Sequence, residues 1–355
     1  MLAALGLLSQ SCGPEGLLES SRQSVSFVVT AATAPATKAT FYDTDNLPAS
    51  LGLLPYTRAE GSTSWALYPS GGGVTPLSRD GRETGVTSGK WIPAPEARLL
   101  WPREGYIRYY AYAPYVGGSS DPVSVTTAYP PTLSYTVPAA VSAQTDLLVT
   151  DAESTKEYSG DPGWRKIDVP LKLVHALTAV RFRIIDGLSI ESVSVGGVKD
   201  AGSLDLSNTA GWTNLSGSAT YTLTNLSLGT GSGSGLKADA DYELLGYNVV
   251  EDEYILLLLP QSPLASGATI TATVSDGTND RTITADISGQ EYWKPGTLVT
   301  YTITRRAPTP DEELSATLAL DLIEWKSEVG VAAWDGVLWN AQRVIAPDIE
   351  RIHWD

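Results

Sequence analysis

The 355-residue sequence contains one cysteine, Cys12, two histidines and one methionine, and only 18% of its residues are charged. A single cysteine excludes an intramolecular disulfide. The two histidines, His175 and His353, are too far apart in the sequence to form a local metal-binding motif. Stretches with the periodicity of an amphipathic helix are also hard to find. These absences argue against a disulfide-stabilised domain, a histidine-based metal site and a helical fold.

Basic residues are scarce relative to acidic ones. The chain has 24 Lys and Arg against 40 Asp and Glu, which gives a formal net charge of −16. An acidic surface repels the phosphates of nucleic acids, so we expect no nucleic-acid partner.

Apolar residues and turn formers are abundant by contrast. Apolar side chains make up 42% of the sequence, enough for substantial cores, and 33 glycines and 22 prolines are spread along the chain. Thr, Ser, Val and Tyr, which favour strands or turns, are frequent as well. This composition predicts an all-β protein with many turns, and the length is typical of two domains.

The clearest strand signal lies near the middle of the chain, in residues 167–186. Apolar residues alternate with other residues on both sides of a break at His175 and Ala176. Alternation with period two predicts two half-buried strands joined by a short connection. The apolar positions are Val169, Leu171 and Leu173 before the break and Val180, Phe182 and Ile184 after it. We interpret this stretch as the start of a second domain.

The residues after this stretch predict a regular series of strands. Residues 189–198 and 219–224 alternate, and residues 255–259 form a continuous apolar run that suits a buried strand. Three further alternating segments are centred on Ala272, Ala285 and Tyr301. Successive strands at this spacing predict an antiparallel sandwich.

The first half of the chain has weaker strand signals, of which residues 106–113 are the strongest. Ile107, Tyr109, Ala111 and Ala113 would share one face of this strand, and Tyr106, Arg108, Tyr110 and Tyr112 would share the other. A row of tyrosines predicts packing against a neighbouring sheet or loop. The alternative interpretation is an exposed platform for sugars.

The N-terminal residues predict export and processing. An apolar run over residues 1–8 ends in small polar residues directly before Cys12, an arrangement typical of a signal peptide and of lipid attachment to the cysteine. Residues 13–24 suit a flexible tether. Arg22, Lys38 and Arg58 are candidate cleavage sites for a trypsin-like protease.

The C-terminal residues predict one more strand and a tail. A polar break at residues 305–313 precedes a strand-like segment at 314–325, and residues 329–355 are rich in Val, Ile and Trp. Such a tail either closes its own sheet or is donated as a strand to another molecule. The candidate donor positions are Val331, Trp334, Val337, Trp339, Val344, Ile345, Ile349 and Ile352.

Candidate catalytic and metal-binding residues are few. His175 has apolar neighbours, and we expect a structural histidine bonded to backbone. Carboxylates at Asp151, Glu153, Asp161 and Asp168 could form a pair for sugar hydrolysis, but clustered loop carboxylates of an acidic protein are usually solvated. The acidic runs 251–253 and 311–313 lack the ligand spacing of a calcium loop. We therefore expect no enzyme activity, no cofactor and no metal.

Taken together, several short segments resemble the fimbrillin family of Bacteroidetes cell-surface lipoproteins, which build type V pili. The segments are Leu8-Ser9-Gln10-Ser11-Cys12, residues 36–40, 101–114, 146–149, 171–182, 259–261 and 293–301. Their order and spacing extend over almost the whole chain.

The resemblance implies two tandem transthyretin-like antiparallel β-sandwich domains followed by a C-terminal strand-like tail. With it we divide the chain into a signal and tether (1–24), an N-terminal domain (25–165), a C-terminal domain (166–310) and a tail (311–355). It also implies an outer-membrane lipoprotein precursor acylated at Cys12, with palmitate for example. A protease would remove an N-terminal strand after a basic residue, and a strand from the next subunit would fill the groove. The partners would be other pilus subunits. The alternative is a surface lipoprotein that binds a glycan or host ligand through aromatic faces.

Overall fold

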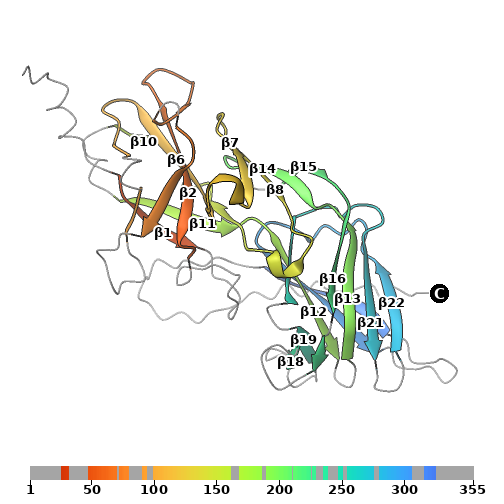
Figure 1. The fold of residues 1–355 in the computed structure, drawn as a ribbon. Coiled ribbons are helices and arrows are strands. Elements are labelled where there is room, and N and C mark those ends of the chain that lie inside the picture. Colours follow the sequence, from red (N-terminus) through yellow and green to blue (C-terminus); the bar gives the residue numbers. More distant parts are fainter. Residues whose placement is uncertain are drawn as a thin grey trace, which may run out of the picture.

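The computed structural model describes residues 25–31, 47–69, 72–79, 90–93, 99–160, 168–185, 189–209, 211–224, 226–228, 235–238, 247–250, 254–275, 280–305 and 316–324. In these ranges the chain is built from strands, two short 3-10 helices, η2 (Gly118–Ser120) and η3 (Val141–Ala143), and no α-helix. Figure 1 shows the early strands, in red and orange, at one end of an elongated molecule and the late strands, in blue, at the other. The all-β prediction is therefore confirmed.

Nine strands form the first sheet, in the order β10-β6-β9-β11-β1-β5-β4-β2-β3. They are β1 (Phe27–Ala31), β2 (Ser50–Arg58), β3 (Ala66–Leu67), β4 (Thr75–Arg79), β5 (Lys90–Pro93), β6 (Tyr106–Ala113), β9 (Leu148–Thr150), β10 (Tyr158–Ser159) and β11 (Val169–His175). Strand β2 also pairs with β6. This additional pairing closes seven of the strands into a ring, so that the sheet surrounds its own apolar core.

A glycine makes room for a tyrosine ring where the sheet closes. Gly52 of β2 lies opposite Tyr112 of β6. A Cβ atom at Gly52 would come within 2.5 Å of the Tyr112 ring and 2.8 Å of a Val74 methyl carbon, so the glycine leaves the space that these side chains occupy.

Strand β6 is buried on both faces. Ile107, Tyr109 and Ala111 belong to the core inside the ring. Tyr110 and Tyr112 point to the other side and belong to a second core, which continues into the rest of the molecule. Tyr110 is 0% exposed and Tyr112 is 1% exposed. The prediction that this tyrosine row packs against neighbouring structure is confirmed for these two residues.

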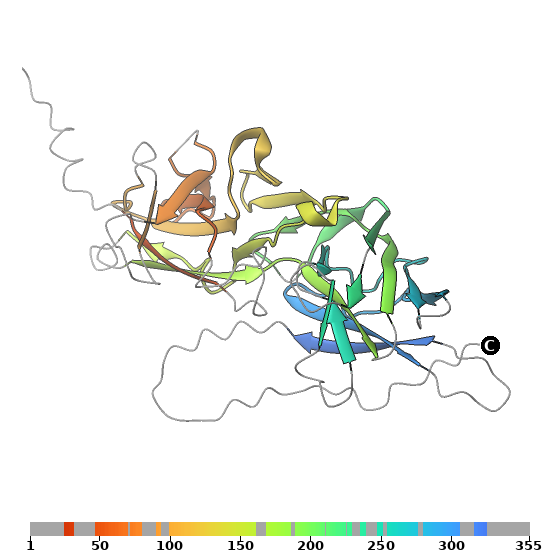
Figure 2. The same ribbon diagram turned by 60° about the horizontal axis from the view of Figure 1, so that its bottom comes forward.

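The remaining strands form three sheets. The largest has the order β17-β18-β19-β12-β23-β24, with β20 beside β12, and the next has the order β16-β13-β21-β22. Their strands are β12 (Thr178–Ile185), β13 (Ser189–Val198), β16 (Ala219–Thr224), β17 (Ser227–Leu228), β18 (Gly235–Ala238), β19 (Tyr247–Val250), β20 (Leu256–Leu258), β21 (Thr269–Ser275), β22 (Asp280–Asp286), β23 (Thr297–Arg305) and β24 (Ala316–Glu324). Every strand predicted for residues 189–303 is present. Apolar side chains from both sheets contribute to the second core. Figure 2 shows the ribbon from another side, with the late strands, in blue, at the end of the molecule opposite the early strands.

The fourth sheet joins the two halves of the chain. It has the order β15-β14-β8-β7, with strands β7 (Val123–Thr126), β8 (Thr132–Thr136), β14 (Ala201–Asp205) and β15 (Thr213–Ser216). Strand β8 pairs with β14 over five residues, although about seventy residues of sequence separate them. Local sequence patterns do not predict such a pairing.

Two features of the structure differ from the sequence-based expectation. Strand β11, which we placed at the start of the second domain, pairs with β1 and β9 in the first sheet. The chain passes to the next sheet only at Ala176 and Leu177, about ten residues later than predicted. In addition, the pairs β1–β11, β12–β23 and β17–β18 are parallel, so the sheets are not purely antiparallel.

Candidate functional site: the seat of strand β1

Most of the predicted site residues lie outside the described residues. These are Cys12, Arg22, Lys38 and the donor-strand candidates Val331, Trp334, Val337, Trp339, Val344, Ile345, Ile349 and Ile352. Arg58 is described, and so is β1, the strand whose removal the resemblance implies. The candidate functional site is therefore the β1 seat, which consists of β1, its neighbouring strands β11 and β5, and the residues that hold β1 in place.

The side chains of β1 alternate between the core and the outside of the ring. Phe27, Val29 and Ala31 are 0%, 2% and 1% exposed, whereas Val28 and Thr30 are half-buried. The alternation follows from strand geometry, in which successive side chains point to opposite faces. Phe27 fills the space beside Tyr109, with ring centroids 5.1 Å apart and an interplanar angle of 86°. The seat therefore takes one apolar side chain at every second position.

Backbone pairing holds β1 on both of its edges. Five residues pair with β11 in parallel register, from Phe27 opposite Val169 to Ala31 opposite Leu173. On the other edge only Phe27 and Val28 pair, with β5. Without β1, the facing edges of β11 and β5 would present unpaired N–H and C=O groups along an apolar groove. A strand of another molecule with the same alternation could satisfy both.

A polar clasp, formed by Ser26, Lys90 and Asp168, fixes the start of β1. The Ser26 hydroxyl donates a hydrogen bond to Asp168 Oδ1. Lys90 Nζ lies 3.0 Å from Asp168 Oδ2. The bond from Ser26 is the largest influence on the carboxyl group and, together with the charge of Lys90, lowers the pKa of Asp168 despite the opposing effect of burial. Because the three residues come from the ends of three neighbouring strands, the clasp ties β1 to both of its neighbours.

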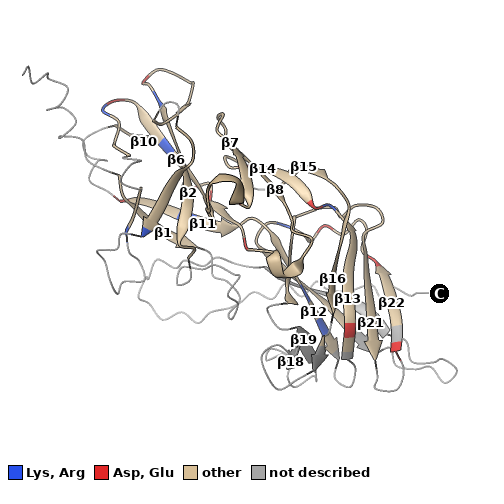
Figure 3. Cartoon of the chain, in the orientation of Figure 1, with Lys and Arg blue, Asp and Glu red and all other residues tan. Residues whose placement is uncertain are grey.

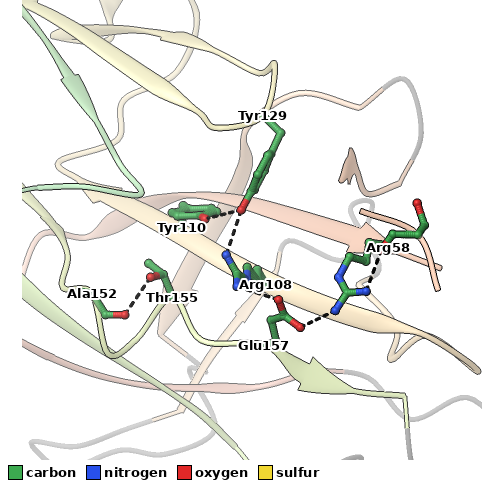
Figure 4. Close-up of polar contacts among 8 residues, drawn as sticks. Arg58, Arg108, Tyr110, Tyr129, Ala152, Thr155 and Glu157 are labelled. Carbon is green, nitrogen blue, oxygen red and sulfur yellow. Dashed lines mark hydrogen bonds and ion pairs between the residues drawn. The ribbon is translucent and has the colours of Figure 1, made fainter. Parts of the chain in front are cut away.

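Arg58 lies at the end of β2 in a network of polar contacts (Figure 4). Its Nη2 atom lies 2.7 Å from Glu157 Oε2, and Arg108 Nη2 lies 2.7 Å from Glu157 Oε1, so that one carboxylate bridges two guanidinium groups. Arg58 also donates to the carbonyl of Ser62, and Arg108 donates to the Tyr129 hydroxyl, both at 2.9 Å. Burial raises the pKa of Glu157, but the hydrogen bonds and charges of the two arginines outweigh it, and the net shift is downward.

A tight turn places Glu157. The Asp151 carboxylate accepts a 2.8 Å hydrogen bond from the Ser154 N–H, and the Thr155 hydroxyl donates to the Ala152 carbonyl. Asp and Thr stabilise turns in this way because their short side chains reach the adjacent backbone. Figure 4 shows the hydrogen bond between Thr155 and Ala152.

Aromatic rings cover the two guanidinium groups. Arg58 lies over Tyr106, 4.2 Å from the ring centroid, and Arg108 lies over Trp65 at 4.9 Å. Tyr129 stacks on Trp65 with centroids 5.6 Å apart. Burial is the main cause that raises the pKa of the adjacent Tyr56 to about 12. Tyr129 is in contact with both Tyr56 and Trp65, and Tyr106 and Trp65 are in contact with the arginines, so these aromatic faces have partners within the chain.

The predicted catalytic candidates also have structural partners. His175 Nδ1 lies 2.8 Å from Asp146 Oδ2, and both side chains are 0% exposed. We expected this histidine to hydrogen-bond to the backbone, but in the structure its Nδ1 atom contacts the carboxylate of Asp146. Asp151 serves the turn before Glu157 and lies 3.5 Å from Lys172 Nζ. Asp161 and the acidic runs 251–253 and 311–313 lie outside the described residues.

Sequence reasoning missed the residues that hold the site together. Ser26, Lys90 and Glu157 carry no motif, and Asp168 was considered only as a catalytic carboxylate. Each finds its partner across the sheet, so no local signal in the sequence could have identified them. Across the described ranges, no cluster of three or more potential metal ligands occurs. None of the helices in those ranges has the length and apolar character needed to span a membrane.

Three solved structures are similar to this chain to different degrees. A crystal structure of a fimbrial protein from Bacteroides vulgatus is similar to 86% of this chain and 100% of its own, with a TM-score of 0.54 and 15% identity. A fimbrial assembly protein from Parabacteroides distasonis matches with a TM-score of 0.43 and 10% identity, over 85% of this chain and 99% of its own. The fimbrial anchor protein Mfa2 from Porphyromonas gingivalis matches with a TM-score of 0.35 and 10% identity, over the same shares of the two chains.

Of these three, the first has a TM-score above 0.5, and at 15% identity it shows a shared fold and nothing more. No curated protein matches the sequence. The family model described as fimbrillin-like matches residues 74–319, which is more than half of the chain. The chain therefore belongs to the fimbrillin-like family.

Proposed function

We propose that this protein is a structural subunit of a cell-surface fimbria, a type V pilus that supports adhesion, and that it polymerises by protease-triggered exchange of a donor strand. The observation that carries the proposal is the position of β1. It contributes Phe27, Val29 and Ala31 to the core of the ring. One connecting segment, residues 32–49, links it to the next strand of the sheet, β2. Cleavage in that segment would release one strand without cutting any other.

The three candidate cleavage sites differ in what they would release. Cleavage after Arg22 leaves β1 attached to the chain, because Arg22 precedes it. Cleavage after Arg58 would detach β2 together with β1, and β2 pairs with β3, β4 and β6. Cleavage after Lys38 separates β1 alone. We therefore propose Lys38 as the processing site.

The incoming strand would come from a second subunit. Its residues would replace Phe27, Val29 and Ala31 with apolar side chains at alternate positions, parallel to β11 and antiparallel to β5. Residues 329–355 remain our candidate donor. A contact in which the tail of one copy fills the groove of the next is heterologous, and such contacts build an open filament.

The remaining parts of the proposal concern export and domains. We propose that the precursor is an outer-membrane lipoprotein acylated at Cys12, that other pilus subunits and a trypsin-like protease are its partners, and that the mature protein lies at the cell surface. We also propose two transthyretin-like domains that meet near Ala176 rather than at residue 166. The support is the transfer of the chain from one sheet to the next at that point.

Limited proteolysis tests the proposal. The purified chain is treated with trypsin, its new N-terminus is identified by mass spectrometry, and its size is followed by light scattering. We expect cleavage after Lys38, loss of the residues that precede Ala39, including β1, and growth of multimers. The matched control lacks residues 329–355, and it should be cleaved in the same way but stay monomeric. Cleavage without any multimers in the full chain would refute strand exchange, and a control that still polymerises would refute the donor assignment.

A further inference from the structure

A second surface suggests a function separate from assembly. The four-stranded sheet β15-β14-β8-β7 lies under the loop that contains η2, and between them is a hollow of about 550 Å³. This volume is within the range of small-molecule sites, about 300–1,000 Å³. Strands from both halves of the chain line the hollow, and neither the β1 seat nor the Arg58 network contributes to it.

The lining consists mainly of small, uncharged polar groups. Hydroxyls and one amide come from Ser124, Ser134, Thr136, Ser203, Asn214 and Ser216. The Ser134 and Ser203 hydroxyls lie 3.4 Å apart on adjacent strands. Of the four strands only β14 contains a charged residue, Asp205, and it does not line the hollow (Figure 3).

One carboxylate, that of Asp121, lines the hollow, and the loop already uses it. It accepts hydrogen bonds from the Tyr112 hydroxyl at 3.1 Å and from the backbone N–H groups of Gly117 and Val123 at 3.2 and 3.3 Å. These bonds fix the loop over the sheet. Asp121 therefore shapes the rim of the hollow.

The lining restricts the kind of ligand. A phosphate or an acidic ligand needs Lys or Arg, and no lining residue carries a positive charge. A divalent cation needs several carboxylates, and the hollow has one. An apolar ligand needs an apolar lining. Hydroxyls and an amide, each able to donate and accept, are complementary to an uncharged molecule with many hydroxyl groups.

The base of the hollow is a well-packed sheet. Leu133 and Leu204 of its two central strands are 0% and 1% exposed and belong to the second core. Side chains mounted on such a packed sheet keep their positions better than side chains on loops.

Asn214 adds an independent observation. Its φ of 52° makes it the one residue other than glycine with a positive φ in the described ranges. Asn tolerates this left-handed conformation better than most residues, but glycine adopts it with less strain. A strained residue in a hollow is a reason to look for function there.

From these observations we propose that the hollow binds an uncharged saccharide. The hydroxyls of Ser134 and Ser203 and the amide of Asn214 would hydrogen-bond to the sugar hydroxyls. This site does not depend on strand exchange, and it would give the subunit a ligand of its own.

The experiment uses the full chain on a printed array of neutral and sialylated glycans, with fluorescence detection. We expect binding to at least one neutral glycan and no preference for sialylated ones. Binding to the best neutral glycan is then measured by isothermal titration calorimetry with three variants. They are the double variant S134A/S203A, N214G, and the control T282A, which removes a hydroxyl paired with Thr273 on a different sheet.

Each lost hydrogen bond should weaken binding about two- to tenfold, because a typical hydrogen bond contributes about 0.5–1.5 kcal/mol. Asn214→Gly keeps the left-handed backbone and removes only the side chain, so it separates the loss of the amide from misfolding. T282A should bind like the unmodified chain. The proposal would be overturned if the chain bound no neutral glycan on the array, or if all three variants bound the glycan with equal affinity.

Discussion

The ring of Phe27 meets the ring of Tyr109 edge-on, 5.1 Å apart, in the core of the first sheet. The two residues belong to β1 and β6, which are not hydrogen-bonded neighbours in the sheet. The contact therefore spans the interior of the ring. If strands are exchanged as proposed, the donor strand would have to fill the same space, and an aromatic or large aliphatic side chain at this position would set its register.

Replacing Phe27 with alanine tests how much β1 contributes to the ring. A buried phenylalanine truncated to alanine costs about 3–5 kcal/mol, because apolar contacts are lost and a cavity remains. Urea unfolding monitored by tryptophan fluorescence measures the change. Thr30→Ala, on the half-buried face of β1, is the control and should cost less than about 1 kcal/mol. If the two variants unfolded alike, the core role of Phe27 would be wrong.

The clasp at Asp168 predicts a dependence of stability on pH. The pKa of Asp168 is lowered in the folded chain. A group with a lowered folded-state pKa stabilises the protein above its unfolded pKa, about 3.9, and this contribution is lost as the pH falls through the folded value. Asp168→Asn should therefore be less stable than the unmodified chain at pH 6, and the difference should shrink in acid below about pH 4. Urea titrations at several pH values measure it, and a constant difference would contradict the assignment.

The sequence predicted strands better than it predicted how they combine. Ile270, Ala272 and Val274 alternate because β21 has one face in the core, and the local pattern is sufficient to find it. Residues 189–198 also predict a strand, although Ile190 and Val193 lie at positions of opposite parity, which a regular strand would place on opposite faces. A bulge between Ile190 and Ser192 shifts the register and brings both side chains into the core.

Pairings between distant segments could not be predicted. The alternation of Val169, Leu171 and Leu173 predicts a strand but does not identify its neighbours. It therefore could not predict that β11 pairs with β1 in the first sheet. The bridge of Glu157 to Arg58 and Arg108 likewise joins residues 99 and 49 positions apart. Such contacts follow from the closure of the ring, which is a property of the whole chain.

The buried pair of His175 and Asp146 should behave as a unit. Removing one partner of a buried pair costs about 3–5 kcal/mol, because the remaining polar group stays buried with fewer hydrogen bonds. His175→Leu and Asp146→Leu should each destabilise the chain in urea unfolding. The double variant should lose clearly less free energy of unfolding than the sum of the two single losses, because it leaves neither buried polar side chain without its partner. Additive losses would show that the two side chains do not interact energetically.

The network around Glu157 predicts where a protease cannot cut. A trypsin-like enzyme must take an arginine side chain into its specificity pocket, but the guanidinium of Arg58 is bound by Glu157 and covered by Tyr106. The backbone of Arg58 is also paired with Tyr106 in the sheet. The bond after Arg58 should therefore resist trypsin until β2 opens locally.

Glu157→Ala should make this bond labile. This variant loses two charge-assisted hydrogen bonds. Because Glu157 is partly exposed and solvent weakens both bonds, we expect their loss to cost about 1–2 kcal/mol of the free energy that keeps β2 closed. That amount raises the population of the open state, and with it the rate of cleavage, about five- to thirtyfold. Mass spectrometry over a time course of digestion measures the fragment that begins at Ala59. Glu153→Ala removes an exposed carboxylate from the same turn and should leave the rate unchanged. Rapid cleavage after Arg58 in the unmodified chain would mean that the network does not protect β2.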